Sequence, residues 1–185
     1  MEVRRRFPLS EPMMLPAAVP ALAGKLMIVT GSGRRLRDIR TNPAANLGVI
    51  AIQADGQSGL LYTSPQRLFE RVTSEVNSHL AVHEDQVAQT GTNFHALIHA
   101  QPPHLTYLSH IPAYRDQTLF NQRLLRWEPE TIINLPEGIG VIPFQLPGSA
   151  ELMAATVAGL RAHRVVLWCK HGVMARSELS VTRAA

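Results

Sequence analysis

Short apolar runs closed by turn residues set the strongest limit on what this chain can fold into. Leu26–Thr30 is one such run and stops at a glycine-rich turn. Residues 47–53 and 60–63 are two more, and Asp55-Gly56 between them is typical of a hairpin turn. Runs of this length are typical of buried strands. None reaches the 18 apolar residues that a membrane-spanning helix needs, so no such helix is predicted.

Helical patterns alternate with these runs along the rest of the chain. Further strands are predicted at 94–100, 131–135, 139–142, 165–168 and 173–175. Helices are predicted at 73–89, 105–109, 116–127 and 148–161, with Gly91 as the stop of the first. This alternation of strands and helices predicts the α/β class.

The first 24 residues differ from the rest. Prolines recur every four residues from Pro8 to Pro20, so we expect an extended arm without a helix, packed on the domain or on a partner chain. Arg4-Arg5-Arg6 and Ala21-Leu22-Ala23 are similar to the two ends of a bacterial signal peptide. The prolines interrupt the apolar core that such a signal requires, so a retained arm is favoured over export.

Composition narrows the class of protein and its partners. The 185 residues are 45% hydrophobic, enough for the core of one domain, predicted to span residues 25–185. A single cysteine, Cys169, excludes an internal disulfide and a multi-cysteine zinc site, and it fits a cytoplasmic protein. The net charge of +4, carried mostly by arginine, favours an anionic partner, either a nucleic acid or a phosphorylated small molecule.

The basic run between positions 34 and 40 bears on the nucleic-acid alternative. It contains Asp38 and lacks the aromatic side chains on which bases stack. A solvated, partly basic surface is therefore favoured, and no nucleic-acid partner is expected. The arginines of this run are Arg34, Arg35, Arg37 and Arg40.

The turn Thr30-Gly31-Ser32-Gly33 ends the first predicted strand. Such a turn can aim backbone N–H groups at an anion. It is not a dinucleotide-binding fingerprint, because Leu36 stands where the third glycine belongs. The same residues are also ordinary turn chemistry, so an anion site and a plain turn both stay open at this point.

Histidine has an uneven distribution, with six of the eight between His79 and His110. His79 and His83 are four residues apart on a predicted helix, a spacing that suits either two metal ligands or two partly buried side chains. His99 ends a predicted strand, and His171 follows another. Because ligands collect where strands feed loops, His99 and His171 are a candidate split metal site.

Three glutamates lie where they can carry either structural or chemical roles. Glu75 follows Thr73 and Ser74 at the start of a predicted helix. That position suits N-terminal capping, and it suits proton transfer if the helix start meets a ligand. Glu130 and Glu137 flank a predicted strand, and each alone suits solvent exposure.

An ordered set of short motifs resembles the class II aldolase/adducin-head family, most closely its rhamnulose-1-phosphate aldolase branch. The set covers residues 25–180. The motifs are Val29-Thr30-Gly31-Ser32-Gly33, Asn42-Pro43-Ala44-Ala45-Asn46-Leu47-Gly48, Thr73-Ser74-Glu75, His99-Ala100-Gln101, Leu135-Pro136-Glu137-Gly138-Ile139-Gly140, Pro147-Gly148-Ser149-x-Glu151-Leu152 and Leu167-Trp168-x-x-His171-Gly172.

The resemblance implies a fold and a chemistry. The fold would be α/β, a single domain with a central, mainly antiparallel sheet flanked by helices. The assembly would be a homotetramer with active sites between subunits. The reaction would be the reversible cleavage of a ketose 1-phosphate, such as rhamnulose 1-phosphate, to dihydroxyacetone phosphate and an aldehyde. A zinc ion would bind the substrate oxygens and stabilise the enediolate.

The resemblance also assigns roles to residues by position. The catalytic, proton-handling residues would be Glu75 and Glu130. The residues that bind the substrate phosphate would be Thr30, Gly31, Thr73 and Ser74. The metal ligands would be His99, Gln101 and His171.

Three departures from the family pattern keep other functions open. Gln101 stands where the family has the second histidine of His-x-His, and an amide oxygen binds zinc less well than imidazole, so His104 or a water is an alternative ligand. The family's phosphate-binding asparagine segment has no counterpart, and both ends are expected to be short, since the sequence stops at Ala185 within an expected helix. A non-catalytic interaction module and a pentulose-5-phosphate epimerase-type enzyme are therefore the alternative functions.

Overall fold

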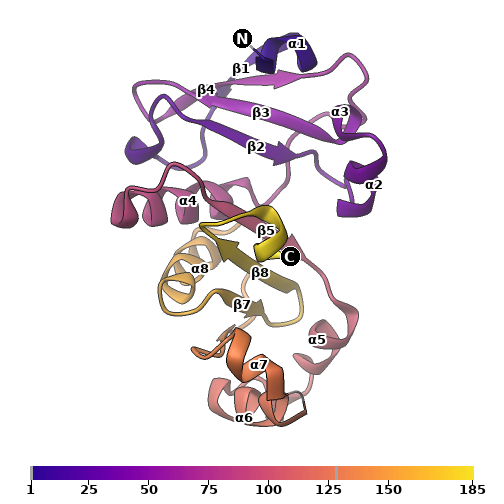
Figure 1. Ribbon diagram of the computed structural model, residues 1–185, viewed down its shortest axis with the longest axis vertical. Coiled ribbons are helices and arrows are strands. Elements are labelled where there is room, and N and C mark those ends of the chain that lie inside the picture. Colours follow the sequence, from indigo (N-terminus) through magenta and orange to yellow (C-terminus); the bar gives the residue numbers. More distant parts are fainter. Residues whose placement is uncertain (1, 128) are drawn as a thin grey trace. The chain divides into compact units, whose positions relative to one another are not determined.

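Two four-stranded sheets organise the chain (Figure 1). The computed structural model describes residues 2–127 and 129–185. Contacts divide the chain into two units, Met1–Glu84 and Asp85–Ala185, with one sheet in each. The division falls within helix α4 (Val76–Thr90). None of the described helices has the length and apolar character needed to cross a membrane.

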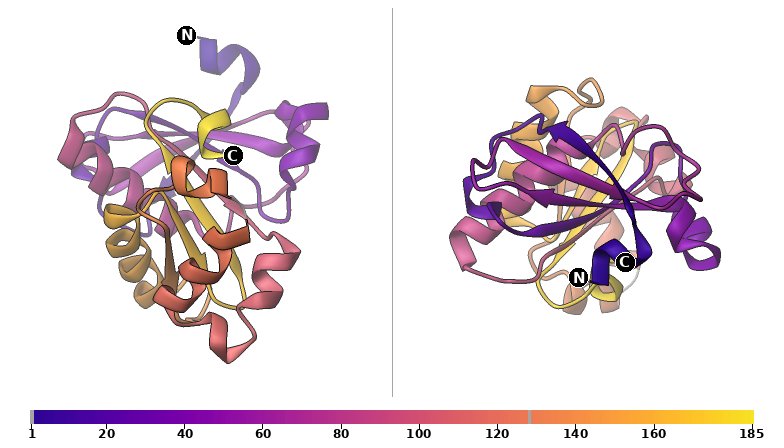
Figure 2. Two further views of the ribbon diagram at one scale, coloured as in Figure 1. Left: turned by 60° about the horizontal axis from the view of Figure 1, so that its bottom comes forward. Right: turned by 90° about the horizontal axis from the view of Figure 1, so that it is seen from above.

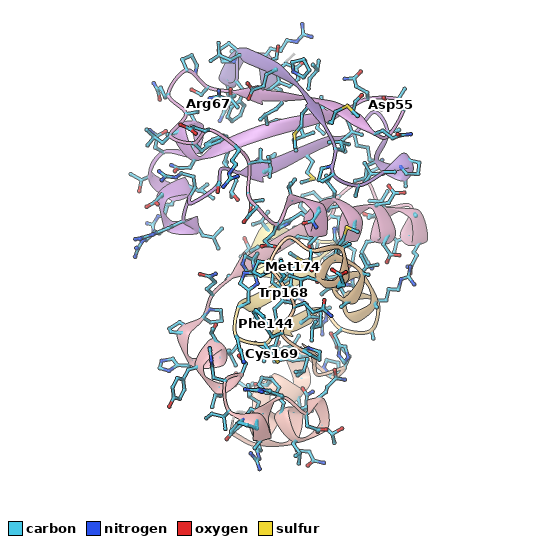
Figure 3. All side chains as sticks on the ribbon, turned by 180° about the vertical axis from the view of Figure 1, so that it is seen from behind. Asp55, Arg67, Phe144, Trp168, Cys169 and Met174 are labelled. Atoms are coloured by element: carbon cyan, nitrogen blue, oxygen red, sulfur yellow. The ribbon has the colours of Figure 1, made fainter. Side chains whose placement is uncertain are left out.

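The first unit is built on an antiparallel sheet with strand order β1-β4-β3-β2. Alternate residues of its strands are buried, as Met27 and Val29 of β2 and Ile50 and Ile52 of β3 show. Asp55 and Arg67 lie at opposite ends of this sheet (Figure 3). Its elements are α1 (Glu2–Arg6), β1 (Leu9–Met14), the 3-10 helix η1 (Pro20–Leu22), β2 (Leu26–Thr30), α2 (Leu36–Thr41), α3 (Pro43–Asn46), β3 (Leu47–Ile52) and β4 (Ser58–Thr63).

The N-terminal residues are more regular than the prediction of an arm without a helix, which is wrong in this respect. Helix α1 forms before the first proline, Pro8, and η1 begins at Pro20, the first helical position, where a missing N–H costs nothing. Strand β1 pairs with β4 and includes Pro12. Because β1 is at the edge of the sheet, a proline is tolerated there.

The second unit is built on a sheet with order β5-β8-β7-β6, in which only β6 and β7 are parallel. Helix α8 connects those two strands. Figures 1 and 2 show α8 and α5 on opposite sides of strands β7 and β8. The elements are β5 (Ala96–Ala100), α5 (Pro103–Leu108), the 3-10 helix η2 (Pro112–Tyr114), α6 (Gln117–Trp127), α7 (Pro129–Asn134), β6 (Ile139–Ile142), α8 (Ala150–Ala162), β7 (Val165–Trp168), β8 (Gly172–Ser177) and α9 (Val181–Ala184).

The predicted class, α/β with mainly antiparallel strands flanked by helices, is confirmed. The strands are divided between two sheets, so the sheet is not one continuous layer. Helix ends also follow the sequence signals. Ser149 accepts a hydrogen bond from the Leu152 N–H at the start of α8, and Gly91, with a φ of 66°, follows the end of α4.

The strand predicted at 131–135 is wrong, because these residues belong largely to helix α7. Glu130 lies in the first turn of this helix, where a carboxylate stabilises the helix dipole. Ile132 and Ile133, whose apolar character suggested a buried strand, are 53% and 79% exposed. The pattern of residue types could not distinguish a short exposed helix from a buried strand.

Strand β6 lies at the edge of its sheet, and two amide side chains of α6 satisfy its outward-facing backbone. Asn121 accepts a hydrogen bond from the Ile139 N–H (2.8 Å) and donates one to the Ile139 carbonyl (2.9 Å). Gln117 accepts one from the Val141 N–H (2.9 Å). The edge is therefore closed to pairing with another strand, and the position of α6 on β6 is fixed.

Candidate metal and phosphate site

A pair of histidine rings lies in the second unit where two segments far apart in sequence meet. His99 is in β5, and His171 is in the turn between β7 and β8. The ring centroids are 5.0 Å apart and the rings meet edge to face, at 68°. Two imidazoles that bind one tetrahedral zinc ion through nitrogens about 2.1 Å away have centroids about 5 Å apart. The separation therefore fits a shared metal ion.

The environment of His99 sets its charge and tautomer. Its Nδ1 atom lies 2.9 Å from the carbonyl oxygen of Val173, which can only accept a hydrogen bond. Nδ1 therefore carries the proton and Nε2 the lone pair, the arrangement usual for a histidine that binds metal. Burial lowers the pKa of His99, the hydrogen bond to Val173 raises it, and the nearby His171 lowers it; the net downward shift favours the neutral ring that a metal ligand requires.

Gly172 brings Gln101 into the same group. A Cβ atom at position 172 would lie 2.5 Å from the Ala100 carbonyl oxygen, 3.0 Å from His99 Cε1 and 3.2 Å from Gln101 Cγ. Only glycine fits at this point between β5 and the turn that carries His171. The predicted ligands His99, Gln101 and His171 are thus brought together around one glycine, which the motif contains but whose role the sequence did not reveal.

Trp168 supports both histidine rings from the interior of the second unit (Figure 3). Its ring centroid is 4.8 Å from that of His99 and 5.0 Å from that of His171. Its indole Nε1–H donates to the hydroxyl of Thr156 (2.9 Å), which donates to the Leu152 carbonyl (2.6 Å). The indole is 1% exposed and is held by this hydrogen bond, so it forms a fixed base for the histidine pair.

The residues present fit a divalent metal ion, although none of the candidate ligands carries a negative charge. Within residues 2–127 and 129–185, no three or more His, Cys, Asp or Glu side chains gather to hold a metal. The second unit supplies two imidazoles and one amide. His104 is exposed in the first turn of α5, and His79 and His83 are half-buried on α4. An amide oxygen in place of a third imidazole would make zinc binding weaker than in a three-histidine site.

The predicted phosphate-binding residues come together in the first unit. Gly31 forms an isolated antiparallel bridge with Val72, and the Thr73 N–H donates to the Thr30 carbonyl (2.9 Å). The turn after β2 therefore lies directly beside the segment that begins α4. The backbone segments that carry Thr30 and Gly31 and that carry Thr73 and Ser74 are thus brought together, which suits a phosphate group.

A second family motif explains how this turn is held. Asn42 caps α3 by accepting a hydrogen bond from the Ala45 N–H (3.1 Å), and Asn46 donates back to the Asn42 carbonyl (2.7 Å). The Asn46 carbonyl then accepts from the Gly31 N–H (3.0 Å). A side chain at position 31 would collide with the ring of Phe69. Gly31 is therefore required for packing, a reason that the sequence pattern alone did not show.

An open groove of about 640 Å³ lies next to this turn in the first unit. It is lined by Ser32, Arg67, Leu68, Phe69, Glu70 and Arg71. The two arginines against a single glutamate give the groove a positive balance. Such a groove favours an anionic ligand approaching the turn.

The candidate proton-handling glutamates have contrasting environments. Glu75 is 3% exposed and lies just before α4, where its N–H is within 3.4 Å of the Thr73 hydroxyl. Glu130 is exposed at the start of α7 in the second unit. Glu137, in contrast, forms an ion pair with Arg164 (2.7 Å), whose hydrogen bond lowers the pKa of Glu137 to about 2. The carboxylate of Glu137 is therefore engaged by Arg164 and has a structural role.

We expect stability to fall between pH 6.5 and pH 4, partly because of His95. Burial lowers the pKa of His95 from 6.5 to about 4, although Glu178 raises it and Arg176 lowers it slightly. The unfolded chain therefore binds this proton first as pH falls, and unfolding is favoured by roughly 2–3 kcal/mol once pH reaches 4. The loss of unfolding free energy between pH 7 and pH 4.5, measured by urea unfolding, should be smaller for His95→Gln than for the unchanged protein. An equal loss in both proteins would contradict this assignment, and His110→Gln, at an exposed histidine, is the matched control.

Comparison with known proteins identifies the family. Residues 17–184 match the Class II Aldolase and Adducin N-terminal domain. The chain belongs to the class II aldolase/adducin family. This match includes both groups of candidate site residues and begins before the predicted domain start at residue 25.

The chain covers only part of the length of its curated relatives. The chain is 32% identical over 174 residues to a rhamnulose-1-phosphate aldolase of Escherichia fergusonii, covering 91% of this chain and 59% of that protein. It is 35% identical over 176 residues to a rhamnulose-1-phosphate aldolase of Bacteroides thetaiotaomicron, covering 94% of this chain and 63% of that protein. The chain thus spans about three fifths of these class II aldolases.

Solved structures of related folds support the same architecture. A sugar-phosphate aldolase from Thermotoga maritima superposes with a TM-score of 0.73 at 24% identity, covering 94% of this chain and 69% of that one. An L-fuculose 1-phosphate aldolase superposes with a TM-score of 0.51 at 21% identity, covering 86% and 62%. At these identities the likeness establishes the fold of this family member.

Proposed function

We propose that this class II aldolase/adducin family member is a metal-dependent aldehyde-lyase. Its substrate would be a ketose 1-phosphate similar to rhamnulose 1-phosphate, cleaved reversibly to dihydroxyacetone phosphate and an aldehyde. The observation that carries the proposal is the His99 ring with its centroid 5.0 Å from that of His171, with Gln101 beside it around Gly172. The names of the rhamnulose-1-phosphate aldolase relatives support this substrate class.

The chain's own residues would divide the work of binding and proton transfer. His99, Gln101 and His171 would hold a divalent ion, which supplies Lewis-acid polarisation of the substrate's carbonyl and hydroxyl oxygens. Backbone N–H groups and hydroxyls at Thr30-Gly31 and Thr73-Ser74 would orient the phosphate. The carboxylate of Glu75 would accept a proton from a substrate hydroxyl or carbon as the carbon–carbon bond breaks or forms. Glu130 would return a proton to the product side.

Zinc content and turnover together test this proposal. We expect the purified protein to bind close to one zinc ion per chain and to release dihydroxyacetone phosphate from rhamnulose 1-phosphate. A coupled reduction of dihydroxyacetone phosphate reports the rate, and NMR of the products separates cleavage from epimerisation. A folded preparation with neither metal nor turnover would overturn the proposal. We also expect a cytoplasmic protein that assembles as a homotetramer, and light scattering measures the number of chains in the assembly.

Gln101→His should strengthen zinc binding by about tenfold or more. The substitution restores a third imidazole beside His99, and imidazole is the better zinc ligand. Competition with a chromogenic chelator measures the dissociation constant. Unchanged or weaker binding would show that position 101 does not reach the metal, and loss of binding in His104→Ala would then assign the third ligand to His104.

A non-catalytic interaction module is the second candidate, favoured by the same amide at position 101. If Gln101 lowers the affinity of the site so far that no metal binds at cellular concentrations, the protein would keep its fold but would not catalyse the reaction. Zinc binding separates the two, because in that case Gln101→His should bind zinc while the unchanged protein does not.

A further inference from the structure

The turn that carries His171 has an unusual backbone. We call Trp168-Cys169-Lys170-His171 the His171 turn, which is closed by a hydrogen bond from the His171 N–H to the Trp168 carbonyl (3.0 Å). Lys170 has a φ of 64°, the one positive value among non-glycine residues that the structure describes. Lysine disfavours this left-handed conformation, so surrounding contacts must hold the turn in place.

Ser109 supplies such a contact at the strained residue. Its Oγ atom accepts a hydrogen bond from the Lys170 N–H (2.6 Å) and donates one to the Thr106 carbonyl (2.6 Å). The Ser109 carbonyl accepts from Arg115 Nε (3.2 Å). Ser109 is fully buried and fixed through both its side chain and its backbone, so its hydroxyl is a rigid acceptor for the turn.

Ser109 also connects the two segments that carry the histidines. It directly follows α5, and α5 begins two residues after Gln101 at the end of β5. The segment that starts with His99 and Gln101 therefore returns, through one short helix, to hold the residue before His171. We call the hydrogen bond between Ser109 and Lys170 the clamp. It joins the segment that runs from His99 through α5 to the segment that runs from Lys170 to Gly172, and Gly172 in turn lies against His99.

We propose that Ser109 is a positioning residue that sets the separation of the His99 and His171 rings by holding Lys170 in its left-handed conformation. The proposal rests on the proposed function, because the separation matters through the metal that these rings would share. It adds a residue that no motif of the chain singled out. Ser109 does not touch the metal or the substrate.

Two substitutions at the exposed Lys170 test the backbone without disturbing the interior. Lys170→Gly and Lys170→Val both remove the ammonium group that lies 5.8 Å from the Phe144 ring, a neighbour of the turn in Figure 3. They differ in their tolerance of a positive φ, which glycine adopts freely and β-branched valine resists. We expect zinc to bind at least about tenfold more weakly to Lys170→Val than to Lys170→Gly. Equal affinities would overturn the proposal.

Ser109→Ala removes the clamp itself. We expect its zinc dissociation constant to rise about tenfold and its Co²⁺ absorption spectrum to change, and Lys170→Gly in the same chain should restore part of the affinity. A merely structural role for Ser109 would lower the unfolding temperature and leave affinity and spectrum unchanged. If Ser109→Ala does not fold, the comparison at Lys170 decides alone.

A measurement without metal separates this proposal from the proposed function. Nuclear Overhauser contacts between the His99 and His171 rings should be present in the unchanged protein and in Lys170→Gly, and lost in Lys170→Val. Their persistence in Lys170→Val would overturn the positioning role. Failure of the unchanged protein to bind zinc, with the ring contacts behaving as expected, would overturn the proposed function alone.

Discussion

His171→Ala should abolish zinc binding and aldol cleavage while the protein remains folded. The imidazole of His171 is one of two that the second unit brings within 5.0 Å, and the third candidate ligand is only an amide. Supporting residues around a metal typically change its affinity 10–100-fold, so the loss of a ligand should exceed about a hundredfold. Isothermal titration with Zn²⁺ measures the affinity, and release of dihydroxyacetone phosphate measures the activity.

The control for this substitution is His110→Ala, which removes an exposed histidine of the same sequence cluster. It should keep zinc binding within about twofold of the unchanged protein. Zinc binding that survives in His171→Ala would show that the metal, if any, is held by other residues. The hypothesis of a split site at the ends of two strands would then be wrong.

Gly172→Ala should weaken zinc binding strongly through displacement of two ligands at once. The added Cβ would lie 2.5 Å from the Ala100 carbonyl oxygen, a backbone atom that cannot rotate away, and it would press on His99 and Gln101. Either β5 and β8 separate locally or the ligand side chains move. We expect a loss of unfolding free energy of about 1–3 kcal/mol and a rise of more than about tenfold in the zinc dissociation constant.

Gly91→Ala provides a matched comparison. Gly91 has a φ of 66° and no neighbouring atom within 4 Å of its added Cβ, so alanine there costs backbone strain of about 1 kcal/mol without a collision. It should lower stability and leave zinc binding unchanged. If Gly172→Ala also retained full zinc affinity, the cradle around His99 and Gln101 would have no part in holding metal.

Secondary structure followed the sequence where one local signal dominated. The strand Leu26–Thr30 was predicted with its bounds, and Ser149 and Gly91 mark the ends of helices as expected. The exceptions were segments whose burial depends on the rest of the chain. Ile132 and Ile133 are apolar but stay exposed, and residues 9–14 form a strand because β4 offers them a partner.

The candidate site divides in the same way. The family that the motifs indicated is established for the chain. The same motifs pointed to the candidate site residues Thr30, Gly31, Thr73, His99, Gln101 and His171. Their roles as ligands remain predictions. The sequence contained no signal for Ser109 or Thr156, since a buried serine or threonine has no characteristic spacing and acquires its partner only when distant segments meet.

The sequence by itself determined which residues can do chemistry, because residue type fixes what a side chain can donate, accept or coordinate. It also determined the α/β class, because apolar periodicity decides which faces can be buried. The sequence proposed His99 and His171 as a pair, but only the tertiary structure decided that their ring centroids lie 5.0 Å apart. That proximity depends on the antiparallel pairing of β5 with β8, which places residues 72 positions apart around Gly172.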